Sequence, residues 1–261
     1  MKILLSNDDG YFATGIQTAF KAIHESCEFS RLDLMAPDRN RSAASNSLTL
    51  MEPLRKTLHA SLSLDDNTKV YSVNGTPTDC VHLGTNGGLG YEPDIVVSGI
   101  NAGANMGDDV IYSGTVAAAT EGRFLGKPSI AISLCGDQNF DTAAHVLVEF
   151  IKDLNNIGLS KDTIININVP DIPLEQLKGV QITRLGRRHV SEPIVQQKDP
   201  RGLPIYWIGP AGEAADEGVG TDFYAVEQGY AAITPLKIDL TQYEMMDALS
   251  LWAEKSIFSK A

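Results

Sequence analysis

Lys2-Ile3-Leu4-Leu5-Ser6 is followed directly by Asn7-Asp8-Asp9-Gly10, so that a short apolar run ends in a polar turn. The run is continuous rather than alternating, which is typical of a strand covered on both faces of a parallel sheet. Gly10 permits the chain to turn tightly after it. The stretch therefore predicts a buried first strand that carries two adjacent carboxylates at its end.

Five further apolar runs have the same character and are expected to be buried strands: 32–36, 69–73, 94–98, 129–134 and 164–169. Helical patterns lie between several of them, at 14–26, 76–84, 115–125 and 141–154. Thr14 with Gln17 is expected to form a capping box, and Thr76 is expected to cap a helix that starts at Pro77. The alternation predicts an α/β fold, a three-layer α/β/α Rossmann-like architecture with a mostly parallel sheet.

The pattern changes after residue 184, which suggests three parts. Residues 1–184 are expected to form the Rossmann-like core, which holds the candidate catalytic residues. Residues 185–229 are rich in Gly, Pro, Arg and Asp and are expected to form a projecting hairpin or irregular extension, with a strand at 203–208. Residues 230–261 are expected to supply a final strand at 230–235 and a C-terminal helix at 241–257.

The C-terminal segment carries an apolar stripe at helical spacing, formed by Tyr243, Met246, Leu249 and Trp252. An apolar stripe of this kind must be buried somewhere. We therefore expect this helix to dock against another subunit and to hold an oligomer together.

Composition excludes several functional classes. Of the 261 residues, 21 are Lys or Arg and 33 are Asp or Glu, giving a net charge of −12. That balance argues against a nucleic-acid polymer or an anionic membrane as the main partner. The three cysteines are scattered, as in a reducing compartment. Residues 1–6 are too short for a signal-peptide core and no apolar run approaches the ~18 residues of a membrane span, so a cytoplasmic location is expected.

The candidate chemistry follows the predicted strands, because ligands of doubly wound sheets bind beyond the carboxyl ends of the strands. Asp8 and Asp9 follow the first strand, and two adjacent carboxylates repel each other unless a cation or hydrogen-bond donors lie between them. Residues 36–47 follow the second strand with two arginines, three serines and two asparagines. For each segment taken alone, an ordinary solvated turn is the alternative.

Residues 98–115 give the sharpest indication of a site. Gly99, Gly103 and Gly107 recur at every fourth position, and Ser113-Gly114-Thr115 then begins a helix. A helix N-terminus offers free N–H groups and partial positive charge to an anion, although neither standard phosphate-binding motif is present. A long capped surface loop is the alternative. Together the three segments offer carboxylate, amide and hydroxyl oxygens, which suit Mg²⁺, Mn²⁺ or Ca²⁺ better than zinc.

Five motifs in this order resemble the SurE family, the survival-protein 5′-nucleotidases. They are ILLSNDDG at 3–10, APDR at 36–39, NGTPTDCV at 74–81, SGINAGAN at 98–105 and YSGTVAAA at 112–119. The likeness continues through 166–170 and 220–222, so it covers nearly the whole chain.

The resemblance implies a metal-dependent phosphomonoesterase that hydrolyses nucleoside 5′-monophosphates, with 3′-nucleotides and short polyphosphate as further substrates. It implies one divalent metal ion, Mg²⁺ or Mn²⁺, and a homodimer or homotetramer. The metal ligands carry over to Asp8, Asp9, Ser42 and Asn101, of which Asp8, Asp9 and Asn101 are the expected catalytic residues. The expected phosphate-binding or substrate-binding residues are Ser45, Asn105, Ser113, Gly114 and Thr115.

One position departs from the family pattern, since the family usually has Gly after the ligand serine and this chain has Ala43. Two other functions stay open. The first is a phosphatase with an aspartyl-phosphate intermediate, as in the haloacid-dehalogenase superfamily, whose two aspartates lie two residues apart rather than adjacent. The second is a nucleotide-binding sensor without turnover, which a phosphate-release assay would separate from an enzyme.

Overall fold

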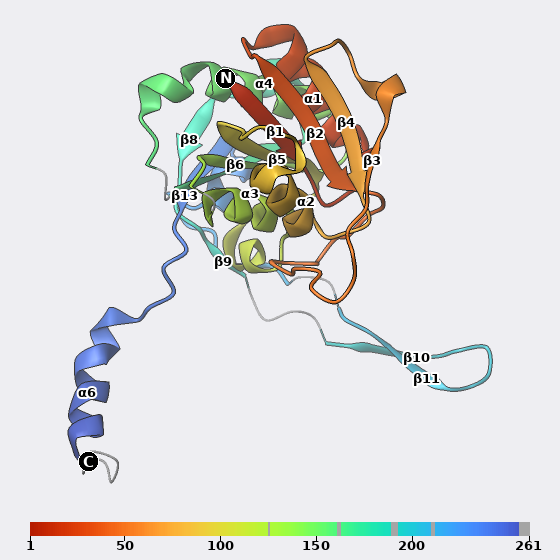
Figure 1. Cartoon of the computed structure of the whole chain (residues 1–261). Coiled ribbons are helices and arrows are strands. Elements are labelled where there is room, and N and C mark those ends of the chain that lie inside the picture. The colour runs from red at the N-terminus through yellow and green to blue at the C-terminus, as the bar shows by residue number, and fades with distance from the viewer. Residues whose placement is uncertain (125, 161–162, 189–192, 210–211, 256–261) are drawn as a thin grey trace.

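The computed structural model describes residues 1–124, 126–160, 163–188, 193–209 and 212–255 (Figure 1). Within these residues the main sheet has nine strands. In spatial order they are β3 (Lys56–Leu58), β4 (Thr68–Val73), β2 (Arg31–Pro37), β1 (Lys2–Ser6), β5 (Ile95–Ala102), β6 (Ser129–Cys135), β7 (Ile164–Pro170), β13 (Ala231–Leu236) and β8 (Val180–Ile182). The predicted α/β fold is confirmed, and each of the six predicted core strands is present.

The central part of the sheet is parallel, running from β4 through β2, β1, β5 and β6 to β7. The edges are mixed, because β3 is antiparallel to β4, β13 is antiparallel to β7, and β8 is parallel to β13. From β1 the chain first builds outward to β2 and β4, and later to β5, β6 and β7 on the other side. The strand order therefore reverses beside β1, which is where doubly wound sheets place their ligands.

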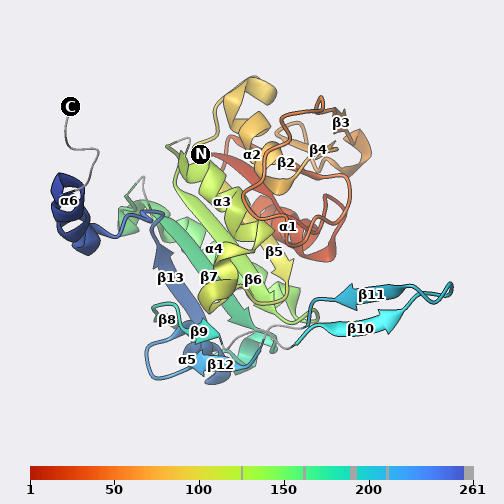
Figure 2. The same ribbon diagram turned by 90° about the horizontal axis from the view of Figure 1, so that it is seen from below.

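Helices cover both faces of this sheet (Figure 2). They are α1 (Thr14–Ser26), α2 (Pro77–Leu83), α3 (Gly114–Phe124), α4 (Phe140–Ile157) and α5 (Asp222–Glu227), whereas α6 (Met246–Lys255) covers neither face. Short single turns are η1 (Ala60–Leu62), η2 (Gly84–Gly88), η3 (Gly107–Ile111), η4 (Leu174–Gln176) and η5 (Tyr243–Met245).

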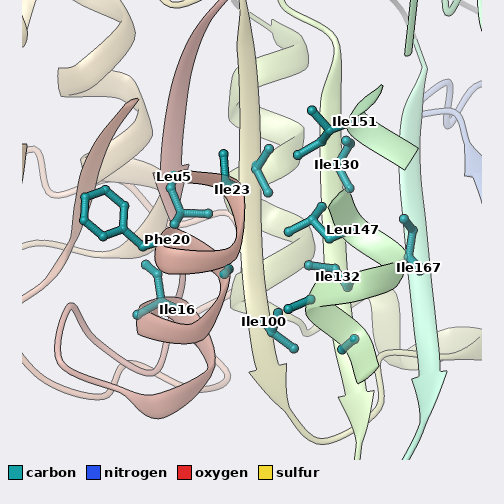
Figure 3. Packing of buried hydrophobic residues seen from close by; sticks show 14 of the residues in the cluster. Leu5, Ile16, Phe20, Ile23, Ile100, Ile130, Ile132, Leu147, Ile151 and Ile167 are labelled. Carbon is teal, nitrogen blue, oxygen red and sulfur yellow. The ribbon is translucent and has the colours of Figure 1, made fainter. Parts of the chain in front are cut away.

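The hydrophobic core divides between the two faces because alternate strand residues point to opposite sides. Leu5 packs with Phe20 of α1 and Leu147 of α4 in the larger cluster (Figure 3). Leu4, one residue earlier, packs with Val81 of α2 and Ala118 of α3 on the other face. The apolar first strand is thus anchored from both sides, which fixes the position of the polar turn that follows it.

Two of the helices, α1 and α2, had predicted capping residues at their N-termini. Thr76 caps α2 as expected, with its hydroxyl accepting from the Asp79 N–H and the Asp79 carboxylate accepting from the Thr76 N–H. The capping box predicted for Thr14 and Gln17 is wrong. Ala13 occupies the cap position without a side-chain bond, and the Gln17 amide instead donates to the Tyr11 carbonyl at 2.7 Å. In the third predicted helix, Leu125 lies outside the described residues.

Beyond the core, β10 (Val195–Lys198) and β11 (Pro204–Trp207) form a hairpin that projects from the body (Figures 1 and 2). At its base, β9 (Arg187–Arg188) pairs with β12 (Ala214–Asp216). The extension also contains α5, which packs against β13 and β7 and had no counterpart in the sequence-based prediction.

The C-terminal helix α6 stands away from the body (Figure 1). It was predicted for 241–257; it starts after the η5 turn, and residues 256 and 257 lie outside the described residues. None of the residues of α6 is buried. Among the described helices, none is both long enough and apolar enough to cross a membrane.

Candidate active site

Asp8 lies against the start of α3. Its Oδ1 accepts a hydrogen bond from the Thr115 hydroxyl at 2.5 Å, and its side chain is almost fully buried. Gly114 makes this approach possible, because a Cβ at that position would lie 2.6 Å from the Asp8 Cβ and 2.8 Å from Oδ2. The glycine in Ser113-Gly114-Thr115 is therefore required by the closeness of β1 and α3.

Asp9 joins the ends of three strands. Its Oδ2 accepts from the Ala102 N–H at the end of β5, and its Oδ1 accepts from the Asn40 side chain after β2, both at 3.2 Å. The Arg41 N–H also donates to the Asp8 carbonyl at 2.7 Å. The structure thus brings together the three strand ends that the sequence singled out.

Ser42 and Asn101 lie at the edges of this group. Asn40 Oδ1 accepts from both the N–H and the hydroxyl of Ser42, at 2.8 and 2.7 Å, so Ser42 is linked to Asp9 through one side chain. Asn101 is at the end of β5, next to the Ala102 N–H that binds Asp9, and its Nδ2 donates to the Gly103 carbonyl at 2.9 Å.

Burial makes the negative charge of Asp8 and Asp9 less favourable, and this is seen in their pKa values. Burial is the main reason that the pKa of Asp8 rises to about 6; the charge of Asp9 adds to the rise and the Thr115 hydroxyl opposes it. Burial also raises the pKa of Asp9, against hydrogen bonds from Ala102 and Asn40. Among the described residues, no Lys, Arg or His side chain forms an ion pair with either carboxylate. Within the described residues, the charge of the pair is therefore offset by hydrogen bonds alone.

The start of α3 offers hydrogen-bond donors beside this charge. The Ser113 hydroxyl accepts from the Val116 N–H at 3.1 Å and so caps the helix. In the described part of the chain, the N–H groups of Gly114 and Thr115 donate to no backbone or side-chain acceptor. Two N–H groups at a helix start that are not used within the protein are suited to bind an anion.

Two other predicted residues lie farther out in the network. The Ser45 hydroxyl donates to the Ile111 carbonyl at 2.8 Å, and this contact holds the loop after β2 against the segment before α3. Asn105 is buried, and its Nδ2 donates to the Ser133 hydroxyl at 2.8 Å. Its carbonyl accepts from the side chains of Asn166 and Asn168, which fixes the glycine-rich loop to β7.

Ala43 adopts a backbone conformation that glycine favours. Its φ is +60°, in the left-handed region. For a residue with a Cβ this conformation costs about 1–2 kcal/mol. The departure from the family pattern at this position therefore places mild strain in the loop directly after Ser42.

The donor set fits a hard divalent cation. Asp8, Asp9, Ser42 and Asn101 offer only oxygen, and a cation between the two carboxylates would offset their repulsion. No group of three or more His, Cys, Asp or Glu side chains that could hold a metal ion occurs in the described ranges, so the proposed set needs the hydroxyl of Ser42 and the amide of Asn101 beside the two carboxylates.

Sequence reasoning missed Asn40 as a site residue. It bridges Asp9 and Ser42 and fixes the relative position of the loops after β1 and β2. Its place between Arg39 and Arg41 in a strand-end segment was visible, but an isolated asparagine in a polar loop does not stand out. The Ala102 N–H was missed because a backbone donor leaves no mark on side-chain composition.

The fold and the site together define a Rossmann-like α/β protein in which an adjacent carboxylate pair lies beside a helix start, at the reversal of strand order. The chain belongs to the SurE family, because the family model described as survival protein SurE matches residues 3–192.

Individual relatives are similar in sequence to this chain over almost its full length. The chain is 67% identical over 254 residues to the 5′-nucleotidase SurE of Hydrogenovibrio crunogenus, a match that covers 97% of this chain and 98% of that protein. It is 54% identical over 260 residues to the 5′/3′-nucleotidase SurE of Proteus mirabilis, covering 100% and 99%. The crystal structure of the SurE protein from Aquifex aeolicus superposes with a TM-score of 0.81 at 42% identity, covering 97% and 100%.

We predict that Gly114→Ala disrupts the contact between β1 and α3. Because the new methyl group would overlap Asp8, the free energy of unfolding should fall by about 1–3 kcal/mol, as for overpacked cores. Displacement of Asp8 should also lower any activity of this site by roughly 10–100-fold. Gly218→Ala is the matched control, because a Cβ there meets nothing closer than 3.7 Å. Equal stability and activity of the two variants would contradict the close-approach argument.

Proposed function

We propose that this protein is a divalent-metal-dependent phosphomonoesterase of the 5′-nucleotidase type, which hydrolyses nucleoside 5′-monophosphates to nucleoside and phosphate. The observation that carries the proposal is that two features of opposite polarity lie side by side. One is the carboxylate pair of Asp8 and Asp9, which forms no ion pair among the described residues. The other is the start of α3, where the N–H groups of Gly114 and Thr115 have no acceptor in the described part of the chain. A phosphate ester bound between them would meet a cation on one side and hydrogen-bond donors on the other. The names of the SurE relatives from Hydrogenovibrio and Proteus support the same activity.

The metal would be one Mg²⁺ or Mn²⁺ ion, held by Asp8, Asp9, Ser42 and Asn101. When bound, it would supply a Lewis acid for the phosphate oxygens. Thr115 and Asn40 would orient the two carboxylates through their hydrogen bonds. Such outer contacts typically change metal affinity or activity by about 10–100-fold.

The phosphate-binding role falls to the start of α3. The N–H groups of Gly114 and Thr115 are fixed before substrate arrives, so they can stabilise charge that develops on the phosphoryl group without reorganising. Ser113 holds the first turn, and Ser45 secures the loop opposite it through Ile111. Asn105 uses one N–H of its side-chain amide for Ser133, and the second is the donor proposed for substrate.

The proposed activity also bears on the range of substrates and on the cellular location of the protein. We infer that 3′-nucleotides and short polyphosphate are further substrates, since a site that recognises a terminal phosphate places few demands on what carries it. The net charge of −12 repels nucleotides at long range, so capture depends on the local cation. Cys27, Cys80 and Cys135 are all free, which is consistent with the proposed cytoplasmic location.

We predict that chelation abolishes phosphate release from AMP or GMP and that Mn²⁺ or Mg²⁺ restores it, because every proposed ligand is an oxygen. Asp8→Asn keeps the side-chain shape but weakens binding of a hard cation, so activity should fall at least about 100-fold while the fold is retained. A colorimetric phosphate assay and circular dichroism measure the two effects.

Asp153→Asn is the control, because it makes the same chemical change on an exposed residue of α4. It should retain full activity. Recovery of activity by Zn²⁺ alone would show that the ligand assignment is wrong. Nucleotide binding without any release of phosphate would support a sensor instead of an enzyme.

We also propose that the protein is a homodimer or homotetramer in which α6 is buried against another copy. Tyr243, Met246, Leu249 and Trp252 are each more than half exposed, and none of the described residues of α6 is buried. A helix of 10 residues is marginal in water by itself, so its stability must come from packing. The projecting hairpin offers a second surface for assembly through Tyr206 and Trp207.

Deletion of residues 241–261 is predicted to shift the oligomer to smaller species. Loss of the apolar stripe removes the surface that we assign to subunit contact, and light scattering coupled to gel filtration measures the mass. Asp247→Asn, a change in the first turn of the same helix, should leave the mass unchanged. An intact, well-folded assembly after the deletion would count against a docking role for α6.

A further inference from the structure

Asp222 is a buried carboxylate that the proposed reaction does not use. It is fully buried, and in the described part of the chain it forms no ion pair. Its Oδ2 accepts from the Gly107 N–H at 2.8 Å, and its Oδ1 accepts from the N–H groups of Gly186 and Phe223 at 2.8 and 3.0 Å. One carboxylate therefore joins the end of the glycine-rich loop to the base of the hairpin extension.

The packing around this carboxylate is equally close. A Cβ at Gly107 would lie 2.7 Å from the Phe223 ring, and a Cβ at Gly186 would lie 2.5 Å from the same ring. The ring thus fits between two backbone segments that Asp222 also binds. Arg188 stacks its guanidinium on the Phe223 ring at 5.0 Å and pairs with Asp109, which adds a third connection. We refer to Asp222, Phe223, Gly107 and Gly186 as the loop joint.

The loop joint is connected to the candidate active site through a short run of backbone. Gly107 begins η3, and the Asp109 carbonyl within that turn accepts from the N–H groups of Tyr112 and Ser113. Ser113 then caps α3, and Thr115 donates to Asp8. A shift at Gly107 would therefore move the helix start that packs against Asp8.

We propose that Asp222 is a positioning residue that acts on the phosphate-binding start of α3 through Gly107 and η3. This inference rests on the proposed phosphomonoesterase function. The carboxylate is suited to the task because it has two acceptor oxygens for donors from two different segments, whereas an amide offers one. The joint also binds the base of the extension, at Gly186, to the loop that precedes this helix start.

The test is Asp222→Asn in the full-length protein with saturating Mn²⁺ and AMP. The amide places an NH₂ group where one oxygen stood, so a donor faces the N–H of Gly107 or Gly186 and that hydrogen bond is lost. We expect kcat to fall by roughly 10–100-fold with little change in KM, because misplaced donors weaken the transition state more than the ground state. Asp216→Asn, which breaks an ion pair with Arg184 in the same extension, should leave kcat unchanged.

Hydrogen exchange supplies a readout that does not depend on turnover. In Asp222→Asn, the hydrogen-bonded amides of residues 107–113 should exchange faster while those of β1 and α1 keep their protection. An even rise across the core, or a kcat per folded molecule equal to that of the unaltered protein, would overturn the positioning role. If the unaltered protein released no phosphate, the proposed function would fail, and the exchange comparison would still decide whether Asp222 fixes this segment.

A second variant covers the case in which Asp222→Asn does not fold. Phe223→Leu keeps an apolar side chain and leaves the carboxylate in place, but it loosens the packing between Gly107 and Gly186. It should produce the same local pattern of exchange and a smaller loss of kcat. Unchanged exchange at 107–113 together with unchanged kcat in Phe223→Leu would also overturn the proposal.

Discussion

The repulsion between two adjacent, partly buried carboxylates at the end of β1 is the constraint on which the candidate site depends. Asp8 and Asp9 are held together because the strand before them is anchored on both faces of the sheet, by Leu5 on one side and Leu4 on the other. Burial raises the pKa of both groups, because a charged carboxylate is less stable when it is removed from water. A divalent cation would offset this repulsion, and this is the physical reason for proposing a metal site at the pair rather than a polar turn.

Most other contacts of the site fix the position of this carboxylate pair relative to the start of α3. Thr115 binds Asp8, Asn40 and the Ala102 N–H bind Asp9, and Gly114 provides the space between strand and helix. Farther out, Asn166 and Asn168 hold the Asn105 carbonyl, and Asp222 holds the Gly107 N–H. The glycine-rich loop is therefore fixed at two points by buried side chains from distant parts of the chain, so that its end, and with it the helix start, is preorganised.

The helices and strands that could be predicted from the sequence are those that depend on residues close together in the chain. Continuous apolar runs identified the buried strands, and Thr76 with Pro77 identified a helix start, because each depends on a few neighbouring residues. The prediction failed at Thr14, where the Gln17 side chain found a partner at Tyr11 instead of completing a capping box. It also missed α5 and the short strands β3, β8, β9 and β12, whose few residues are stabilised mainly by tertiary contacts.

The same distinction holds for the site. Asp8, Asp9 and the Ser113-Gly114-Thr115 helix start stood out, since strand-end carboxylates and a capped glycine have a clear chemical meaning. Asn40 and Asp222 did not, because their roles come from the segments they join, 31 residues apart for Asp9 and Asn40 and 115 for Gly107 and Asp222. Pairings of that range are set by the fold and cannot be inferred from one chain without its structure.

The proposed reaction depends above all on the binding of one divalent cation by Asp8 and Asp9 together. The most direct test is a titration of the purified, metal-free protein with Mn²⁺, followed by electron paramagnetic resonance of the free ion in the absence of substrate. We predict one Mn²⁺ per chain and loss of this site in Asp9→Asn, with binding retained in Asp153→Asn. Undiminished Mn²⁺ binding by Asp9→Asn, or no binding by the unaltered protein, would contradict it.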